Sequence, residues 1–252
     1  MNSICPVITM NVAVTNHENA VITVRKLSTE SQGAYVCVSN VHMCMEVFDS
    51  AEFRSVVNNA DLVIPDGKPI AWAQQLLGYK DAQQVRGEDI MHALCEKSDK
   101  GSFNIGLYGG SSESLLEVVK EKLSITHPNI NITFGYSPPF RPLTAQEDEK
   151  LIKEINDSNV NVLFVGIGCP KQERWMAAHK EHLNCVMLGV GAAFDFIAGS
   201  QKHAPRWIQK IGMEWAFRLS CEPKRLWKRY LKQNPRFMYH FFKQYIRYKL
   251  KG

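Results

Sequence analysis

The sequence lacks three features that would place the protein outside the cell or across a membrane: a disulfide framework, a long apolar run and a signal peptide. Its seven cysteines form no CxxC pair and are odd in number, so we expect buried free thiols in a reducing compartment rather than a disulfide framework or a zinc ribbon. The longest apolar run, residues 185–194, stops at Asp195 after about ten residues, well short of the roughly twenty that span a bilayer. The first twenty residues do not resemble a signal peptide. We therefore expect a cytosolic protein without a transmembrane helix.

Several ligand-binding signatures are also missing. No Asp-x-Asp follows a predicted strand, and no set of His, Cys and carboxylate residues has metal-ligand spacing, so we predict no metal site and no cofactor. The sequence has neither a Walker A loop nor a complete GxGxxG fingerprint, which disfavours a dinucleotide-dependent oxidoreductase. It also has no RRM, KH or helix-turn-helix signature, which disfavours a nucleic-acid-binding module.

Charge is distributed unevenly along the 252 residues. Residues 201–252 contain 14 Lys and Arg against two Glu, a net charge of +12, whereas residues 1–200 carry a net charge of −7. A basic tail rich in aromatic residues indicates an anionic partner, either nucleic acid or the cytoplasmic leaflet of a membrane. Because no nucleic-acid signature is present, we favour an anionic membrane surface.

The pattern of apolar residues predicts an α/β fold. Short β-rich runs occur at residues 34–40, 60–65, 103–109, 129–136, 160–168 and 185–191. Helical patterns lie between them at residues 42–58, 68–77, 88–97, 111–124, 145–156 and 171–182. Nearly continuous apolar strands separated by helices are typical of a mainly parallel sheet with helices on both faces. We predict a Rossmann-like catalytic domain over residues 1–200, with an antiparallel hairpin in the first thirty residues, and a basic helical appendage over residues 201–252.

The appendage contains one strongly amphipathic segment. Asn234 and Pro235 are favourable as N-cap and first residue of a helix that runs to about Leu250. At 100° per residue, one half of this helix consists of Phe237, Met238, Phe241, Phe242, Tyr245 and Ile246. The other half carries Arg236, His240, Lys243 and Arg247. Such a helix either docks on the protein's own core or lies in a membrane interface.

Polar residues follow the first two predicted strands, where open α/β sheets bind ligands. Ser39 and Asn40 end the first strand, and Asp66 follows the second in a Pro-Asp-Gly sequence. Asp66 has two interpretations. It could cap the following helix within a tight turn, or it could be a carboxylate at the ligand edge whose apolar surroundings make it a useful general base.

Glycine-rich turns follow three other strands, and the last of these turns contains Gly189 and Gly191. Gly109 and Gly110 precede one helix, while Gly166 and Gly168 precede another that contains Gln172. A phosphate can approach backbone amides at such helix starts, so we predict a phosphate-bearing ligand there. Two further candidate ligand-binding residues are Tyr136, which ends the run at residues 129–136, and Asp195, which follows the run at residues 185–191.

The longer motifs resemble the WecG/TagA/CpsF glycosyltransferases. The matching segments, in family order, are ADLVIPDGKPIAWAQQLLG, VRGEDIM, LYGGSSES, FVGIGCPKQERWM and GVGAAFDFIAGSQKHAPRWIQKIGMEWAFRLSCEPKRLWKRYL. The resemblance covers residues 35 to about 245. It implies a metal-independent, inverting transferase that moves an N-acetylmannosamine-type sugar, or its uronic acid, from UDP to polyprenyl-diphosphate-linked N-acetylglucosamine. It also implies a role in bacterial surface polysaccharide synthesis, at the inner face of the cell membrane.

The resemblance assigns roles to particular residues. Asp66 matches the family's catalytic base, and Gln172 matches a residue that contacts the sugar. Three arginines of the appendage correspond to residues that complete the site over the diphosphate at the membrane, namely Arg218, Arg225 and Arg229.

Two departures from the family pattern affect the predicted substrate contacts. Many members have Thr-x-Asn where this chain has Val38-Ser39-Asn40, so the hydroxyl contact is either lost or moved to Ser39. Many also have Arg where this chain has Gln84, and Arg86 is the candidate replacement. The exact donor sugar, the pathway and homo-oligomer formation stay open.

Overall fold

The computed structural model describes residues 3–30, 32–98 and 103–251. Its residues cluster into two compact units, each assembled from separate parts of the chain. Unit 1 comprises Met1–His17, Val38–Arg86 and Lys202–Gly252, and unit 2 comprises Glu18–Cys37 and Gly87–Gln201. These discontinuous units differ from the predicted body and appendage, and a separable appendage from residue 201 stays a prediction.

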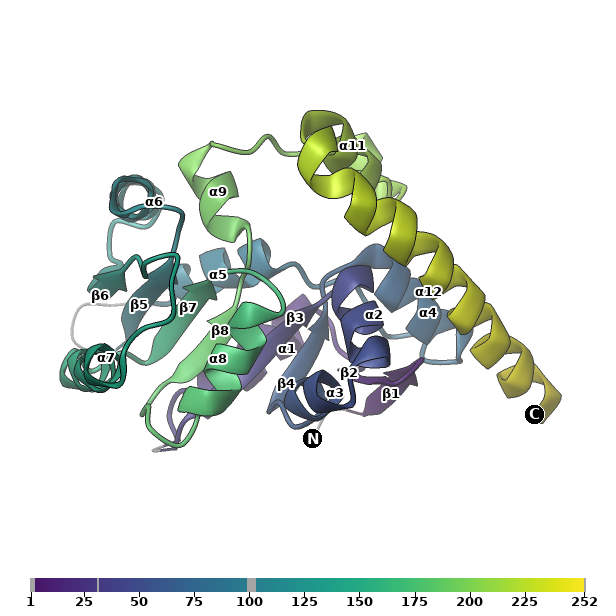
Figure 1. Ribbon diagram of the computed structural model, residues 1–252, viewed down its shortest axis with the longest axis horizontal. Coiled ribbons are helices and arrows are strands. Elements are labelled where there is room, and N and C mark those ends of the chain that lie inside the picture. Colours follow the sequence, from purple (N-terminus) through teal and green to yellow (C-terminus); the bar gives the residue numbers. More distant parts are fainter. Residues whose placement is uncertain (1–2, 31, 99–102, 252) are drawn as a thin grey trace. The chain divides into compact units, whose positions relative to one another are not determined.

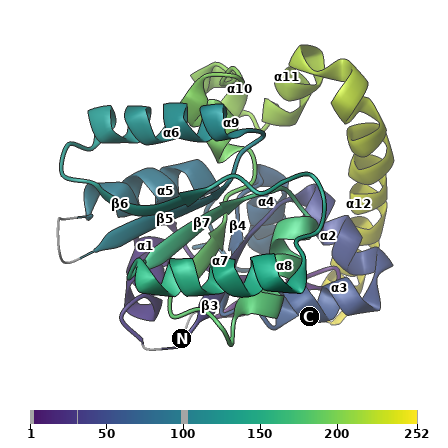
Figure 2. The same cartoon turned by 60° about the vertical axis from the view of Figure 1, so that its left-hand side comes forward.

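The strands form two sheets (Figures 1 and 2). The small sheet pairs β1 (Ile4–Val7) with β2 (Met10–Ala13) in antiparallel fashion, which confirms the predicted hairpin. The large sheet has the order β4-β3-β8-β7-β5-β6. Its members are β3 (Ala34–Ser39), β4 (Leu62–Pro65), β5 (Asn104–Gly109), β6 (Asn131–Tyr136), β7 (Val162–Gly166) and β8 (Val186–Gly189). The pairs β3–β8, β8–β7, β7–β5 and β5–β6 are parallel, so the predicted Rossmann-like α/β class is confirmed.

One or more helices follow each strand of the large sheet along the chain, and α1 precedes the first of these strands. The first six are α1 (His17–Leu27), α2 (Val41–Asp49), α3 (Ala51–Asn58), α4 (Lys68–Leu76), α5 (Gly87–Glu96) and α6 (Glu113–Thr126). The others are α7 (Ala145–Asp157), α8 (Lys171–His179), α9 (Ala193–Ala198), α10 (Arg206–Lys210), α11 (Glu214–Cys221) and α12 (Pro223–Lys251). The helix predicted over residues 42–58 is two helices, because Ser50 ends α2 with its backbone N–H and caps α3 with its hydroxyl.

Unit 2 is a layered α/β structure. Helices α6 and α9 lie on one side of its strands, and α7 and α8 lie on the other (Figures 1 and 2). The central strands β7 and β8 are almost wholly buried, which explains why their sequences read as continuous apolar runs. Because the interiors of these two strands are buried and apolar, the polar groups near them lie at the strand ends and in the turns after them.

Unit 1 contains the long helix α12, whose observed start differs from the predicted one. The helix begins at Pro223 and continues through Pro235, so the expectation that Asn234 caps a helix beginning at Pro235 is wrong. Proline inside a helix removes one backbone hydrogen bond. Burial of Leu226, Phe237 and Phe241 on either side of Pro235 offsets this loss and keeps the helix continuous.

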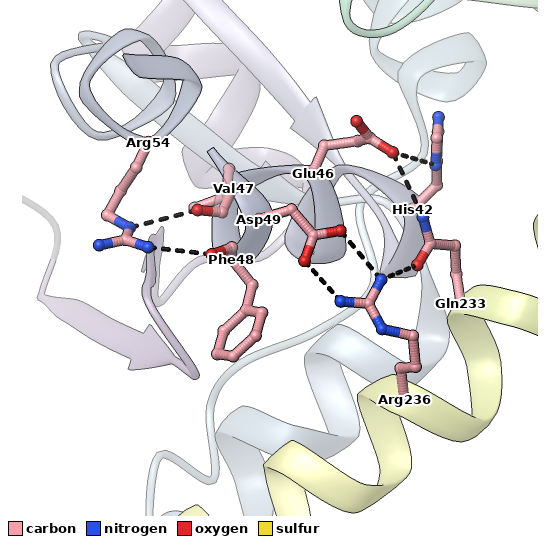
Figure 3. Close-up of polar contacts among 8 residues, drawn as sticks. All are labelled: His42, Glu46, Val47, Phe48, Asp49, Arg54, Gln233 and Arg236. Carbon is pink, nitrogen blue, oxygen red and sulfur yellow. Dashed lines mark hydrogen bonds and ion pairs between the residues drawn. The ribbon is translucent and has the colours of Figure 1, made fainter. Parts of the chain in front are cut away.

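The two faces of α12 also differ from the prediction. The helix packs against α2, where Arg236 pairs with Asp49 and Gln233 donates to Glu46 (Figure 3). His240 stacks on Phe48 with ring centroids 4.1 Å apart. Arg236 and His240 therefore lie on the docked side, not on an open basic face. Beyond the docked stripe, α12 exposes Trp227, Leu231, Met238, Phe242, Ile246 and Leu250.

Among the described residues, no helix combines the length and apolar character needed to cross a membrane.

Candidate active site

In unit 1, the end of β3 is hydrogen-bonded to β4 and to the loop that follows β4. Ser39 is completely buried, and its hydroxyl donates to the Ile64 carbonyl at 2.7 Å. Its own carbonyl accepts from the backbone N–H groups of Asp66 and Gly67. Asn40 caps α2 by accepting from Met43 N–H at 3.2 Å. The Ser39 hydroxyl is thus used to join two strand ends, and a role in substrate binding stays a prediction.

Asp66 is half-buried and held through its backbone on both sides. Its N–H donates to Ser39 at 2.8 Å, and its carbonyl accepts from Nε2 of Gln84 at 2.7 Å. Helix α4 begins with Gly67 as N-cap, without a hydrogen bond from any capping side chain. Asp66 thus lies one residue before the N-cap position, and the general-base interpretation is the one to test.

Arg86 makes contacts that the sequence did not suggest. Its Nη1 donates to Oε1 of Gln209 at 2.7 Å, and its Nη2 lies 3.2 Å from Oε2 of Glu214. Gln84 and Arg86 are two residues apart but have different partners. Gln84 contacts the loop that contains Asp66, and Arg86 contacts α10 and the start of α11.

The arginines predicted to meet the diphosphate lie on α11 and α12. Arg218 is on α11, while Arg225 and Arg229 are on the first turns of α12. Arg225 binds Glu222 through Nε and Nη2, and this hydrogen bonding lowers the pKa of the Glu222 carboxyl. The guanidinium of Arg229 lies over the Tyr230 ring, 5.8 Å from its centroid. All three arginines belong to unit 1.

In unit 2, two of the predicted glycines are required by packing. Gly109 has a φ of +139°, and a Cβ there would lie 2.5 Å from the Gly166 carbonyl oxygen. A Cβ on Gly166 would lie 2.8 Å from the Phe194 ring. Gly110 donates its N–H to the same Gly166 carbonyl at 3.3 Å. Close packing, against backbone at Gly109 and against the Phe194 ring at Gly166, thus explains both glycines without a ligand.

Gly168 is different, because a Cβ at this position would meet nothing within 4 Å. Its φ of +86° favours glycine, and the space beside it is open. Its N–H donates to Oε1 of Gln172 at 3.1 Å, and Gln172 N–H returns a bond to the Gly168 carbonyl at 2.9 Å. Among the predicted glycines, Gly168 best fits close approach by a ligand.

Gln172 is only 3% exposed, and its amide is held on both sides. Besides accepting from Gly168, it donates through Nε2 to Oε1 of Glu173 at 2.7 Å. Glu173 is fully buried, and its Oε2 has no hydrogen-bond partner among the described residues. Burial raises the pKa of the Glu173 carboxyl, and hydrogen bonds from Gln172 and Cys169 oppose that rise in part.

Tyr136 ends β6 at the edge of a row of rings. Its ring is parallel to Tyr108 with centroids 6.2 Å apart, and Tyr108 stacks on Trp175 at 4.3 Å. Burial raises the pKa of the Tyr108 hydroxyl. Asp195 lies in the first turn of α9, where its carboxylate accepts from Ser200 and Gln201 at 3.4 Å.

Sequence reasoning missed the partners of the predicted residues. Glu214 and Glu222 are the two acidic residues of the basic segment 201–252, and each binds an arginine that the sequence predicted as substrate-binding. The small number of acidic residues in this segment was a usable signal, because a single carboxylate among 14 cations indicates a specific ion pair. Buried Glu173, directly after Gln172, had no such signal.

The sequence matches one family of known proteins over almost its whole length. A model described as the glycosyl transferase WecG/TagA/CpsF family matches residues 5–251. An N-acetylglucosaminyldiphosphoundecaprenol N-acetyl-beta-D-mannosaminyltransferase of Bacillus subtilis (strain 168) is 29% identical over 201 residues, which cover 79% of this chain and 75% of the relative. A relative of the same name from Staphylococcus aureus (strain NCTC 8325 / PS 47) is 30% identical over 192 residues, covering 76% and 72%.

Proposed function

Since the chain belongs to the WecG/TagA/CpsF family of glycosyl transferases, we propose that it transfers an N-acetylmannosamine-type sugar from a UDP-sugar to polyprenyl-diphosphate-linked N-acetylglucosamine. The printed activity of the relatives from Bacillus subtilis and Staphylococcus aureus supports both the sugar and the lipid-linked acceptor. The uronic acid of the same sugar is the alternative donor. The product would be a lipid-linked disaccharide for a bacterial surface polysaccharide.

Asp66 is the proposed general base of an inverting displacement. It takes the proton from the attacking hydroxyl of the acceptor, a new bond forms between that oxygen and the anomeric carbon, and UDP leaves with the bonding electrons. The observation that carries this assignment is the fixed backbone of Asp66 at the end of β4: its N–H donates to Ser39 and its carbonyl accepts from Gln84. A backbone held on both sides keeps the attachment point of the carboxylate in place.

The proposed binding group for the donor diphosphate is the set of glycine turns in unit 2. Gly110 lies just before α6, and Gly168 lies just before α8. The N–H groups of Gly110 and Gly168 are bonded within the protein, so the proposed donors are the N–H groups that follow them at the two helix starts. The open space at Gly168 allows close approach. Gln172 orients this turn, and contacts from Tyr136 and Asp195 to the nucleotide or sugar are further predictions.

The proposed cations for the UDP leaving group are Arg218, Arg225 and Arg229 rather than a metal ion. Arginine binds phosphate oxygens through paired N–H groups, and it can neutralise the charge that develops as UDP departs. Metal independence is therefore part of the proposal, and EDTA is the reagent that tests it.

We further propose that α12 attaches the protein to the cytoplasmic face of the membrane, where the lipid-linked acceptor lies. The exposed side chains Trp227, Leu231, Met238, Phe242, Ile246 and Leu250 form an apolar surface on a helix that is rich in Lys and Arg. Amphipathic helices of this composition bind anionic lipid by insertion of apolar side chains and by attraction of about 1 kcal/mol per cation.

The proposal is tested by incubating the protein with UDP-N-acetylmannosamine and a short-chain polyprenyl-diphosphate N-acetylglucosamine in EDTA, then determining the product by mass spectrometry. We expect a product heavier by one N-acetylhexosamine residue. UDP-N-acetylglucosamine and UDP-glucose serve as control donors. Turnover only after a divalent cation is added would overturn metal independence, and absence of product with every donor would overturn the assigned reaction.

A further inference from the structure

Arg86 joins the Asp66-containing part of unit 1 to the segment that carries the C-terminal arginines. Its two terminal nitrogens contact different elements: Nη1 donates to Gln209 of α10 at 2.7 Å, and Nη2 lies 3.2 Å from Glu214 of α11. The side chains of Arg86 and Glu214 are only 25% and 35% exposed, so solvent screens this ion pair less than a fully exposed one. One guanidinium thus links two short helices.

The same segment is attached at two other points on α4. Lys68 donates through Nζ to the carbonyl of Lys210, at the end of α10. The Trp72 ring lies against Gly212, where a Cβ would come within 2.4 Å of the ring. Gln209 is itself oriented, since its Nε2 donates to the Ala204 carbonyl at 2.7 Å. These attachments fix α10, and Arg86 extends them to the first residue of α11.

Helix geometry connects this contact to Arg218. Glu214 and Arg218 are four residues apart on α11, so they lie on the same face of the helix. The contact between Arg86 and Glu214 therefore fixes the direction in which that face of α11 points. Loss of the contact would leave α11 free to turn and would displace Arg218 with it.

We propose that Arg86 is a positioning residue, which acts through Glu214 to orient α11 and thereby to place Arg218 for the departing diphosphate. The role of Arg218 in this statement rests on the proposed function, whereas the link from Arg86 to α11 does not. Direct contact between Arg86 and the substrate is the competing account. The two accounts differ in one expected result. If Arg86 acts through Glu214, a compensating substitution of Glu214 restores the activity of an Arg86 variant, and if Arg86 contacts the substrate it does not.

A charge-reversal cycle separates them. Arg86→Glu and Glu214→Arg are each expected to lower kcat at least tenfold in the transfer assay, with KM for the UDP-sugar within threefold of wild type. The double variant restores an ion pair of reversed polarity, and its kcat is expected to return to within fivefold of wild type. A double variant as inactive as Arg86→Glu overturns the proposal, and so do single variants that stay within twofold of wild type.

Hydrogen exchange of residues 206–221 provides a readout that does not depend on turnover. We expect Arg86→Glu to speed amide exchange in α11 and the double variant to return it to the wild-type rate. Unchanged exchange in Arg86→Glu overturns the link even if the enzyme is active. If the wild-type protein transfers no sugar, the proposed function fails while the exchange experiment still decides the link.

The matched control is Lys153→Glu, which makes the same change in charge. Lys153 pairs with Asp157 on an exposed surface of α7. We expect this variant to match wild type in both turnover and exchange. If it slows turnover as much as Arg86→Glu does, net charge accounts for the effect and the positioning role is overturned.

Discussion

The two units offer ligands different kinds of groups. In unit 2, the proposed groups for the donor diphosphate are backbone amides in turns that follow β5 and β7, and the glycines there are set by φ angle and close packing. In unit 1, the proposed base and cations are charged side chains, and the geometry of this unit depends on pairs far apart in sequence, such as Arg86 with Glu214. Backbone groups bind a phosphate without titrating, whereas side chains can exchange protons and neutralise charge. Under the proposed function, unit 2 supplies the groups that bind and unit 1 supplies the groups for proton and charge chemistry.

The sharpest way to break this comparison is to remove the base in unit 1. Asp66→Asn keeps the size of the side chain but cannot take a proton, and general-base catalysis contributes about 10² to 10⁴ in rate. We expect kcat to fall by about that factor and the thermal midpoint to stay within about 2 °C of wild type. Asp81→Asn, an exposed position of the same unit, is the control and should retain full turnover. Turnover of Asp66→Asn within threefold of wild type would remove Asp66 from the mechanism.

Two glycines of unit 2 should respond differently to the same substitution. Gly109→Ala places a Cβ against the Gly166 carbonyl at a positive φ, so the free energy of unfolding should fall by about 2–5 kcal/mol. Gly168→Ala meets no neighbour and should cost about 1–2 kcal/mol through its φ alone. Gly168→Ala should nevertheless weaken UDP binding by about tenfold, as measured by calorimetry. Unchanged UDP affinity would show that Gly168 is only a turn residue.

Buried Glu173 predicts a pH dependence of stability. Its pKa is raised in the folded protein above the ordinary 4.5, so the folded state holds the proton more tightly than the unfolded state. The stabilisation is complete below pH 4.5 and declines by about 1.4 kcal/mol per pH unit as the pH rises toward the folded pKa. Glu173→Gln has no proton to lose and should gain stability relative to wild type between pH 5 and pH 7 in urea titrations. If the unfolding free energies of wild type and Glu173→Gln change with pH in the same way, a raised pKa of Glu173 is contradicted.

The smallest expected effect concerns the exposed face of α12. Phe242→Ser removes one exposed aromatic ring and should weaken binding to phosphatidylglycerol vesicles by about tenfold, since a buried Phe contributes about 1.5–3 kcal/mol. Its unfolding free energy should stay within about 0.5 kcal/mol of wild type. Ile125→Ser, an equally exposed apolar position on α6, is the control and should bind vesicles normally. Equal losses in both variants would show that α12 is not the attachment surface.

The sequence predicted the strands well because each carries a local signal. The run from Val162 to Gly166 is apolar throughout and ends in glycine, which is the pattern of a buried parallel strand. Helix α12 was predicted less well. Asn234 and Pro235 form a good local helix start, but Leu226 and Phe237 are buried on either side and keep one helix continuous across them. Packing, which a local pattern does not contain, decides that boundary.

The candidate site also contains parts that the local sequence predicts and parts that it does not. Glycine turns at strand ends are visible in the sequence because strand, glycine and helix are adjacent there. The contact between Arg86 and Glu214 spans 128 residues, and no local rule connects them. The buried state of Gln172 was equally hidden, because its partner Glu173 looks like an ordinary polar residue of a helix start.

The most direct test of the division between binding and chemistry measures UDP affinity and turnover on the same two variants. Asp66→Asn should bind UDP within twofold of wild type and transfer almost no sugar. Gly168→Ala should bind UDP about tenfold more weakly, yet approach the wild-type kcat when donor is saturating. If Asp66→Asn instead loses UDP affinity in proportion to its turnover, or if Gly168→Ala binds normally and loses kcat, the assignment of chemistry to unit 1 and binding to unit 2 is contradicted.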